Sequence, residues 1–382
     1  MKSTALTTAI AISTRGKMMP AVCKAARYCA VAEILAILFI AISSAAATEA
    51  RRAVWVSATE PNLGLNVVRD DGHVVAYRDV TGVKGPRIIP GLDEIVATTA
   101  RLALRRDGVV LTWQPQCGAN NNDPKDTEHE FCEYSSAHLI PGLSRIVAIS
   151  EDGGAYLALD RDGKVWGWGD DSDGLISGGT PVAQPFGKSF QHRLVGIPVP
   201  IPLPVPMKAI SASVAQGAAI DREGHVWLWG GQRFPALRAP GDDFFGPKAF
   251  VARRVVGIPP AKLIDSTYVV TQTGQVWRWG VSSTNGARES VNPSRVASVT
   301  NIIGLSYAKS FTAMLDSSGS VLFIGAAPDA PSYGKFNNEP HASKLMPPSK
   351  FISAGARITM DGTVLYFSEI RAGVVQRLEL GN

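Results

Sequence analysis

The chain has 382 residues, a formal net charge of +5 and 45% hydrophobic residues. This apolar content excludes an intrinsically disordered chain, and the length is sufficient to bury a large core. The first 47 residues hold five basic residues and one glutamate, which leaves the remainder of the chain near +1. That balance excludes the basic footprint typical of nucleic-acid-binding proteins, so we expect no nucleic-acid partner.

The N-terminal segment has the layout of a secretory signal peptide. Basic residues between Lys2 and Arg27 precede an apolar run over 34–42, and small residues occupy 43–47. We therefore expect a signal peptide over 1–47, cleaved near Ala47, and a periplasmic or secreted mature chain over 48–382 without a membrane span. The apolar run is short for a transmembrane helix. The alternative is an uncleaved N-terminal anchor.

Seven short repeats follow along the rest of the chain. In each copy a valine stands two positions after a glycine, and in six copies an aromatic residue stands five positions after the same glycine. The copies read DDGHVVAYR, RDGVVLTWQ, RDGKVWGWG, REGHVWLWG, QTGQVWRWG, SSGSVLFIG and MDGTVLYFS, with glycines Gly72, Gly108, Gly163, Gly224, Gly274, Gly319 and Gly362. Units recurring at this spacing indicate a repeat architecture.

Each repeat predicts a β-hairpin. An Asp-Gly turn between β-prone runs is a strong hairpin signal, because glycine tolerates the positive φ of tight turns. One apolar run precedes each hairpin and another follows it, which gives about four strands per unit. We predict an all-β fold, a seven-bladed β-propeller of four-stranded blades with the hairpin tryptophans in its core. The alternative is a β-sandwich. The proline-rich segment 197–206 is predicted to run extended, as polyproline II or as an edge segment.

The hairpin pattern D-G-x-V-W-x-W-G resembles the repeat of the regulator of chromosome condensation family. The best copies lie at 162–169, 223–230 and 273–280. The resemblance implies a seven-bladed propeller, a degenerate secreted bacterial-type member, and a binding platform rather than a particular activity. The family's N-x-x-G-Q-L-G stretch is approached only at 169–179, so no functional residue is carried over.

Two cysteines, Cys117 and Cys132, lie in a long insertion after Trp113. In an oxidising compartment an even pair predicts a disulfide, here closing a loop of about 15 residues. The alternatives are two free thiols, or a zinc site with His129 and His138, whose spacing matches no recognised pattern. We predict no metal and no cofactor.

The longest connections join the third and fourth strands of the second, third and fourth units, at about 114–136, 170–193 and 231–250. We expect them on one face of the propeller, where long loops serve binding or are tolerated decoration. The candidate binding residues are Asp126, Glu128, Glu130, Asp170, Asp171, Asp173, Phe244 and Phe245. The adjacent phenylalanines are the predicted anchors. The run 170–174 lacks the spaced ligands of a calcium loop.

No catalytic motif is present, so we predict no catalytic residue. The preferred interpretation is an exported, non-catalytic, monomeric platform for an unknown protein partner. One alternative is a periplasmic or secreted enzyme, a hydrolase or lyase with its site in the propeller channel. Another, by family analogy alone, is a host-directed effector that acts on a small GTPase.

Overall fold

The computed structural model describes residues 51–58, 65–77, 87–113, 115–117, 132–152, 154–171, 174–177, 194–213, 216–233, 248–284, 287–307, 311–325, 337–342, 347–353, 356–367, 375–378 and 380. All of these residues belong to one compact unit, Arg51–Asn382. Within it every regular element that the structure describes is a strand. No helix in this described part is long and apolar enough to cross a membrane.

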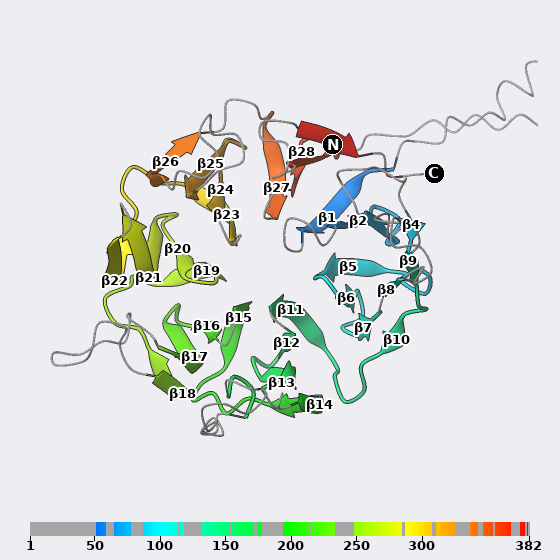
Figure 1. Cartoon of the computed structure of the whole chain (residues 1–382), viewed down its shortest axis with the longest axis horizontal. Coiled ribbons are helices and arrows are strands. Elements are labelled where there is room, and N and C mark those ends of the chain that lie inside the picture. Colours follow the sequence, from blue (N-terminus) through cyan, green and yellow to red (C-terminus); the bar gives the residue numbers. More distant parts are fainter. Residues whose placement is uncertain are drawn as a thin grey trace, which may run out of the picture. The chain divides into compact units, whose positions relative to one another are not determined.

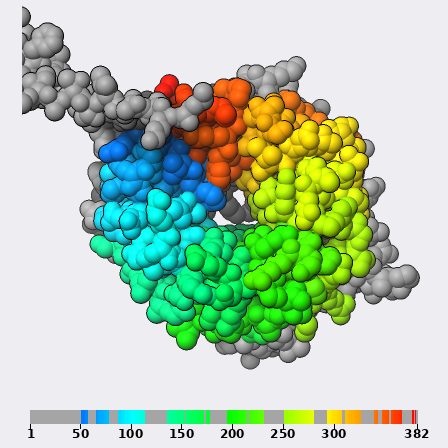
Figure 2. Space-filling view, turned by 180° about the vertical axis from the view of Figure 1, so that it is seen from behind, coloured from blue at the N-terminus to red at the C-terminus, as the bar shows by residue number. Residues whose placement is uncertain are grey.

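Seven antiparallel sheets of four strands each stand around a central channel (Figures 1 and 2). Blade 1 holds β1 (Ala53–Ala58), β2 (Leu65–Arg69), β3 (Val74–Tyr77) and β4 (Arg87–Ile88); blade 2 holds β5 (Ile95–Thr98), β6 (Leu102–Arg105), β7 (Val110–Thr112) and β10 (His138–Leu139); blade 3 holds β11 (Ile146–Asp152), β12 (Ala155–Asp160), β13 (Val165–Asp170) and β14 (Leu194–Pro200); blade 4 holds β15 (Met207–Ser213), β16 (Gln216–Asp221), β17 (Val226–Arg233) and β18 (Lys248–Arg254).

The remaining three blades follow the same plan. Blade 5 holds β19 (Ala261–Asp265), β20 (Tyr268–Thr271), β21 (Val276–Thr284) and β22 (Ala287–Arg295); blade 6 holds β23 (Ile302–Tyr307), β24 (Phe311–Asp316), β25 (Val321–Gly325) and β26 (Asn337–Ala342); blade 7 holds β27 (Ser349–Ser353), β28 (Ala356–Thr359), β29 (Val364–Phe367) and β30 (Val375–Leu378). The first strand of each blade lies innermost (Figure 1). A separate two-stranded sheet pairs β8 (Pro115–Cys117) with β9 (Cys132–Tyr134). The predicted seven-bladed propeller is therefore confirmed.

The repeated glycine lies in the turn between the second and third strands of each blade, and aspartate precedes it in blades 1, 2, 3 and 7. In blade 3 the amide of Gly163 donates to the carbonyl of Asp160 at 3.0 Å, and Gly163 has a φ of +93°. The Asp160 carboxylate accepts the amides of Asp162 and Lys164, both at 3.0 Å. This turn sets the register that places Leu159 opposite Val165. The hairpin forms because glycine and aspartate satisfy the tight turn locally.

Each of the seven repeat glycines also contacts the next blade. Its carbonyl accepts a hydrogen bond of 2.8 to 3.1 Å from the amide that opens the following inner strand. The donor and acceptor pairs are Ile95 and Gly72, Ile146 and Gly108, Met207 and Gly163, Ala261 and Gly224, Ile302 and Gly274, Ser349 and Gly319, and Ala53 and Gly362. The last pair joins blade 1 to blade 7 and closes the ring. An added Cβ at any of these glycines would lie 2.7 to 3.1 Å from the next blade.

All seven inner strands are bulged just after this first residue. In blade 3 the register to β12 shifts between Ile146 and Ala148, and the intervening Val147 is 47% exposed. A bulge of this kind leaves one residue unpaired and bends the strand. The opening amide can therefore face the preceding blade while the rest of the strand pairs with its own. The seven bulged residues are Val54, Val96, Val147, Lys208, Lys262, Ile303 and Lys350.

The core lies between the blades, as expected for sheets covered on both faces. Trp229 of blade 4 packs in one cluster with Leu157 and Leu159 of blade 3. Four hairpin tryptophans are buried, namely Trp113, Trp168, Trp229 and Trp279, which confirms core packing for them. The first four residues of the proline-rich segment 197–206 lie in β14, the outer strand of blade 3. These four residues are extended as an edge strand, one of the two conformations that the sequence predicts, whereas 201–206 lie outside the strands.

Blades 1 and 7 close the ring by packing, and each is built from one end of the described chain. Their shared cluster includes Val56 and Tyr77 from blade 1 with Ile358 and Tyr366 from blade 7. The rings of Trp55 and Phe351 lie 4.6 Å apart between centroids, which adds an aromatic contact at the same seam.

We predict that Gly163→Ala destabilises the protein far more than Gly142→Ala. Both glycines have positive φ, so each alanine costs about 1 kcal/mol in backbone strain. A Cβ at Gly163 would also lie 2.7 Å from the Met207 carbonyl oxygen, whereas nothing lies within 4 Å of one at Gly142. The expected losses in free energy of unfolding are about 3 kcal/mol or more and about 1 kcal/mol. Thermal denaturation of both variants measures this, and equal losses would contradict the inter-blade role.

Candidate functional site

One face of the propeller carries the long connections of three adjacent blades. β7 ends at Thr112 and β10 begins at His138; β13 ends at Asp170 and β14 begins at Leu194; β17 ends at Arg233 and β18 begins at Lys248. In blade 5 the same connection spans only 285–286. Successive strands of a blade are antiparallel, so these connections leave the same face as the ends of the inner strands. We call this the long-loop face.

Most of the predicted binding residues lie outside the described part of the chain. These are Asp126, Glu128, Glu130, Asp173, Phe244 and Phe245. The backbone of Asp170 pairs with Leu194 at the end of β13. Asp171 is 1% exposed, and its Oδ1 accepts the amides of Ile176 at 2.7 Å and Ser177 at 3.2 Å. The Asp171 carboxylate therefore holds the first turn of the blade 3 connection.

That turn inserts two aliphatic side chains between blades 3 and 4. Leu175 is 1% exposed and Ile176 is fully buried, and both belong to the core cluster shared by these blades. The indole Nε1 of Trp229 donates to the Leu175 carbonyl at 2.9 Å. A side chain at Gly167 would meet Ile176 at 3.3 Å, so this glycine makes room for the inserted turn. The turn lies within the stretch 169–179 that approaches the family's sequence after the hairpin.

The ends of the inner strands form a polar network on the long-loop face. Between blades 1 and 2, the hydroxyls of Ser57 and Thr98 lie 2.8 Å apart, and the Asn66 amide donates to the Thr99 carbonyl at 2.9 Å. Between blades 2 and 3, the Glu151 carboxylate accepts hydrogen bonds from the Thr99 hydroxyl and, at 3.0 Å, from the Arg101 amide. These bonds fix the relative positions of the first three inner strands.

The network continues through blades 4 to 6 and centres on Asp265. Its Oδ1 accepts the Ser211 hydroxyl of blade 4 at 3.4 Å, and its Oδ2 accepts the Tyr307 amide of blade 6 at 2.8 Å. The Ser211 hydroxyl in turn accepts the Ser266 amide at 2.9 Å. One carboxylate thus links three successive blades.

Burial perturbs the carboxyl groups of this network. Desolvation raises the pKa of Asp265 to about 6, and the nearby Asp152 carboxylate acts in the same direction. Desolvation also raises the pKa of Glu151, against the lowering effect of its hydrogen bonds. Burial, with Tyr268, Asp152 and Asp265 nearby, raises the pKa of the Tyr307 phenol. Perturbed carboxyl groups of this kind occur at functional sites and in structural networks alike.

The opposite face, where the Asp-Gly turns lie, offers two features with local explanations. Asp221, Glu223 and His225 place one ligand atom each within 4.8 Å of one another. The Asp221 carboxylate, however, already accepts the indole Nε1 of Trp227 at 2.9 Å and the His225 amide at 2.8 Å. The cluster therefore serves the hairpin turn of blade 4.

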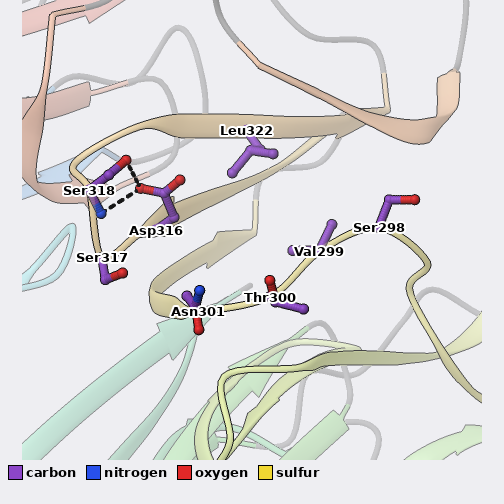
Figure 3. Close-up of a pocket in the computed structure, with 8 residues that line it drawn as sticks. All are labelled: Ser298, Val299, Thr300, Asn301, Asp316, Ser317, Ser318 and Leu322. Carbon is purple, nitrogen blue, oxygen red and sulfur yellow. Dashed lines mark hydrogen bonds between the residues drawn. The ribbon is translucent and has the colours of Figure 1, made fainter.

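A hollow of about 260 Å³ lies on the same face in blade 6 (Figure 3). Asp316, Leu322 and the linker residue Ser298 are among its lining residues. Figure 3 shows Ser318 turned back to Asp316, whose Oδ1 accepts its amide at 2.8 Å and its hydroxyl at 2.6 Å. Blades 3 to 5 have a tryptophan where blade 6 has Leu322. We attribute the hollow to this smaller side chain.

No protein-family model matches the chain. The E3 ubiquitin-protein ligase HERC2 of Homo sapiens is 27% identical over 222 residues, which cover 54% of this chain and 4% of that protein. The mouse protein is 29% identical over 157 residues, 37% of this chain and 3% of that protein. The chain thus spans only a few per cent of the length of these curated relatives.

Solved structures resemble this chain in fold. Human WBSCR16 aligns with a TM-score of 0.59 and 15% identity, over 79% of this chain and 84% of that one. Prp20p from Saccharomyces cerevisiae, described with its binding to Gsp1p and histones, aligns with a TM-score of 0.54 and 15% sequence identity over 76% of each chain. Yeast RCC1 (Prp20) bound to Kap60 aligns with a TM-score of 0.55 and 15% sequence identity, over 76% of this chain and 74% of that one. The chain is a seven-bladed β-propeller, and its seven hairpin repeats resemble those of the regulator of chromosome condensation family.

The sequence alone did not identify the polar network. Its members lie on different blades, with Asp265 and Ser211 54 residues apart, so no short motif connects them. The available signal is that the inner strands end in polar residues, as in Ser150–Asp152 and Asp265–Ser266. Once a propeller is predicted, such endings belong to one channel mouth.

We predict that Asp265→Asn removes a pH-dependent part of the stability. A carboxyl group whose pKa is raised by folding stabilises the protein at low pH, and this contribution is lost as the pH rises through about 6. Wild-type protein should therefore lose about 1 kcal/mol more than the variant between pH 5 and pH 8, because the pKa of Asp265 lies about one unit above pH 5. Glu151, whose pKa is also raised by burial, contributes an effect of the same sign in both proteins. Thermal denaturation at several pH values tests this, with Glu223→Gln on the opposite face as control; parallel curves for wild type and Asp265→Asn would contradict it.

Proposed function

We propose that this chain is an exported, non-catalytic protein-binding platform that uses the long-loop face of blades 2 to 4. The observation that carries the proposal is the grouping of three long connections, from three adjacent blades, on one face. Long connections in a compact domain are uncommon, and binding is one of the usual functions of those that occur. A rigid ring of sheets beneath them would hold such loops in fixed relative positions.

The fold neighbours support the class of function and leave the partner open. Prp20p is described with its binding to Gsp1p and histones, and yeast RCC1 (Prp20) is described bound to Kap60. These are properties of those proteins, at 15% identity to this chain. The propeller type is therefore one that serves protein recognition, and the partner of this chain would be set by its own loops.

Export is supported by the N-terminal layout of basic, apolar and small residues over 1–47. A periplasmic or secreted platform would meet its partner in the envelope or outside the cell. A monomer suffices for this role, because the three connections belong to one chain.

The energetic centre of the proposed interface is the pair Phe244 and Phe245 in the connection between β17 and β18. Buried aromatic anchors commonly contribute several kcal/mol at interfaces. The acidic run that includes Asp126, Glu128 and Glu130 would act mainly on the association rate and on salt sensitivity. Asp171 contributes indirectly, because its carboxylate holds the first turn of the neighbouring loop.

A second candidate function is an enzyme, a hydrolase or lyase acting at the mouth of the channel. One observation favours it: the Asp265 carboxyl, with a pKa of about 6, is accompanied there by Glu151 and Tyr307. A carboxyl group titrating near neutral pH suits general acid–base catalysis. Both Asp265 oxygens already accept hydrogen bonds from neighbouring blades, which favours the structural role and places this candidate second.

We predict that replacing Phe244 and Phe245 together with alanine weakens capture of the partner from envelope extract by at least tenfold, because the anchors are lost. The melting temperature should change little. Met360→Ala is the matched control, since Met360 is 66% exposed in a hairpin turn on the opposite face. Affinity is then measured for whichever protein the wild-type chain captures and Met360→Ala retains.

Two results would contradict this platform. Retained capture together with a large fall in melting temperature would show that the two rings are core residues. The enzyme would be favoured instead if the wild-type chain captures no protein but shows activity in a hydrolase and lyase screen, and if Asp265→Asn abolishes that activity.

A further inference from the structure

The insertion of blade 2 contains a two-stranded sheet of its own. Among the strands that the structure describes, β8 and β9 pair only with each other, and neither joins the four strands of the blade. The antiparallel register places Pro115 opposite Tyr134, Gln116 opposite Glu133, and Cys117 opposite Cys132. The two cysteines are therefore the last paired residues of the two strands before the 14-residue connection 118–131.

This register meets the distance requirement of a disulfide. Directly opposed residues of an antiparallel pair have Cα atoms about 4.5 to 5.5 Å apart. Disulfides join residues whose Cα atoms are about 4.4 to 6.8 Å apart. The backbone alone thus brings the two cysteine positions within bonding range, without movement of either strand.

The small sheet also requires a stabilising link. It has three residues in each strand, and Pro115 has no amide hydrogen to donate. An isolated two-stranded sheet is marginally stable at best in water. A covalent bond at its last rung would hold the register at the root of the loop.

We propose that Cys117 and Cys132 form a disulfide that staples the β8–β9 sheet and, through it, holds the outer strand of blade 2. The two thiols lose two electrons and two protons, and the S–S bond forms. The acceptor is a disulfide of a thiol–disulfide oxidoreductase or of glutathione, which is reduced to two thiols. The inference goes beyond the binding function and does not depend on it.

The disulfide would stabilise the pairing of the outer strand β10 with β7, because β10 is short and a long connection separates the two strands. β10 pairs with β7 through only two residue pairs, His138 with Thr112 and Leu139 with Leu111. The connection between these strands spans 113–137. A bond between 117 and 132 shortens the path to about 11 residues, which lowers the entropic cost of closing this contact. Stapling therefore favours docking of β10, whose neighbour Ile140 donates its amide to the Val110 carbonyl at 3.0 Å.

Peptide mapping tests the bond itself. The purified full chain is equilibrated in an oxidising glutathione buffer like that of secretory compartments, then alkylated and digested with trypsin. Cleavage after Arg106, Lys125 and Arg145 puts each cysteine in its own peptide, 107–125 and 126–145. We expect one linked species that separates only on reduction. Two alkylated separate peptides, or stoichiometric zinc with both thiols unoxidised, would overturn the proposal.

Hydrogen exchange tests the structural role. In the double variant Cys117→Ser/Cys132→Ser, the amides of Leu139 and Ile140 should exchange at least tenfold faster than in the oxidised wild type. Amides of β12 in blade 3 serve as the internal control and should be unchanged. Reduced wild-type protein should match the double variant, which separates loss of the bond from effects of the substitutions. A linked peptide with unchanged exchange at β10 would overturn the stapling role.

Discussion

The structure depends on one backbone hydrogen bond that occurs seven times, from the first amide of an inner strand to the hairpin glycine of the preceding blade. The carbonyl can receive this bond only if its residue adopts a positive φ and lets the next blade approach closely. At Gly163 the φ is +93°, and the Met207 carbonyl oxygen would lie 2.7 Å from an added Cβ. Only glycine meets both conditions without strain. The hairpin glycine that makes the repeat recognisable in the sequence is therefore also the residue that joins successive blades. At Gly362 the same bond joins blade 7 to blade 1 and closes the ring.

Because this bond lies on the hairpin face, the blades are joined differently on the two faces of the propeller. On the hairpin face the chain enters six of the seven blades under backbone restraint. Glu94, Arg145 and Asn301 adopt positive φ just before the inner strands of blades 2, 3 and 6, and blades 4, 5 and 7 have proline there. The long-loop face is joined by side chains instead, as where Asp265 links blades 4 to 6. Backbone restraints on one face leave the connections on the other face able to vary in length, from 285–286 in blade 5 to 113–137 in blade 2.

The sequence predicted what depends on single residues and their neighbours. The glycine turns, the strands beside them and the blade count follow from local signals such as Asp160–Gly163, and the structure confirms them. It could not predict interactions between blades, because no spacing rule relates the Trp229 indole to the Leu175 carbonyl 54 residues earlier. For the same reason Asp171 resembled an exposed loop carboxylate in the sequence. Its burial follows from the insertion of Leu175 and Ile176 between two blades, which only the assembled ring reveals.

The roots of two long connections bear on how a binding face could work here. Binding costs entropy in proportion to the loop that must become ordered, and restraint before binding reduces that cost. The blade 3 connection begins with a turn fixed by the Asp171 carboxylate and inserted in the core. The blade 2 connection passes through the β8–β9 register before it reaches 118–131. Each connection is therefore restrained close to the propeller body, at the residues that the structure describes. Long loops with restrained roots are better suited to recognising a partner than loops restrained only by the strands at their two ends.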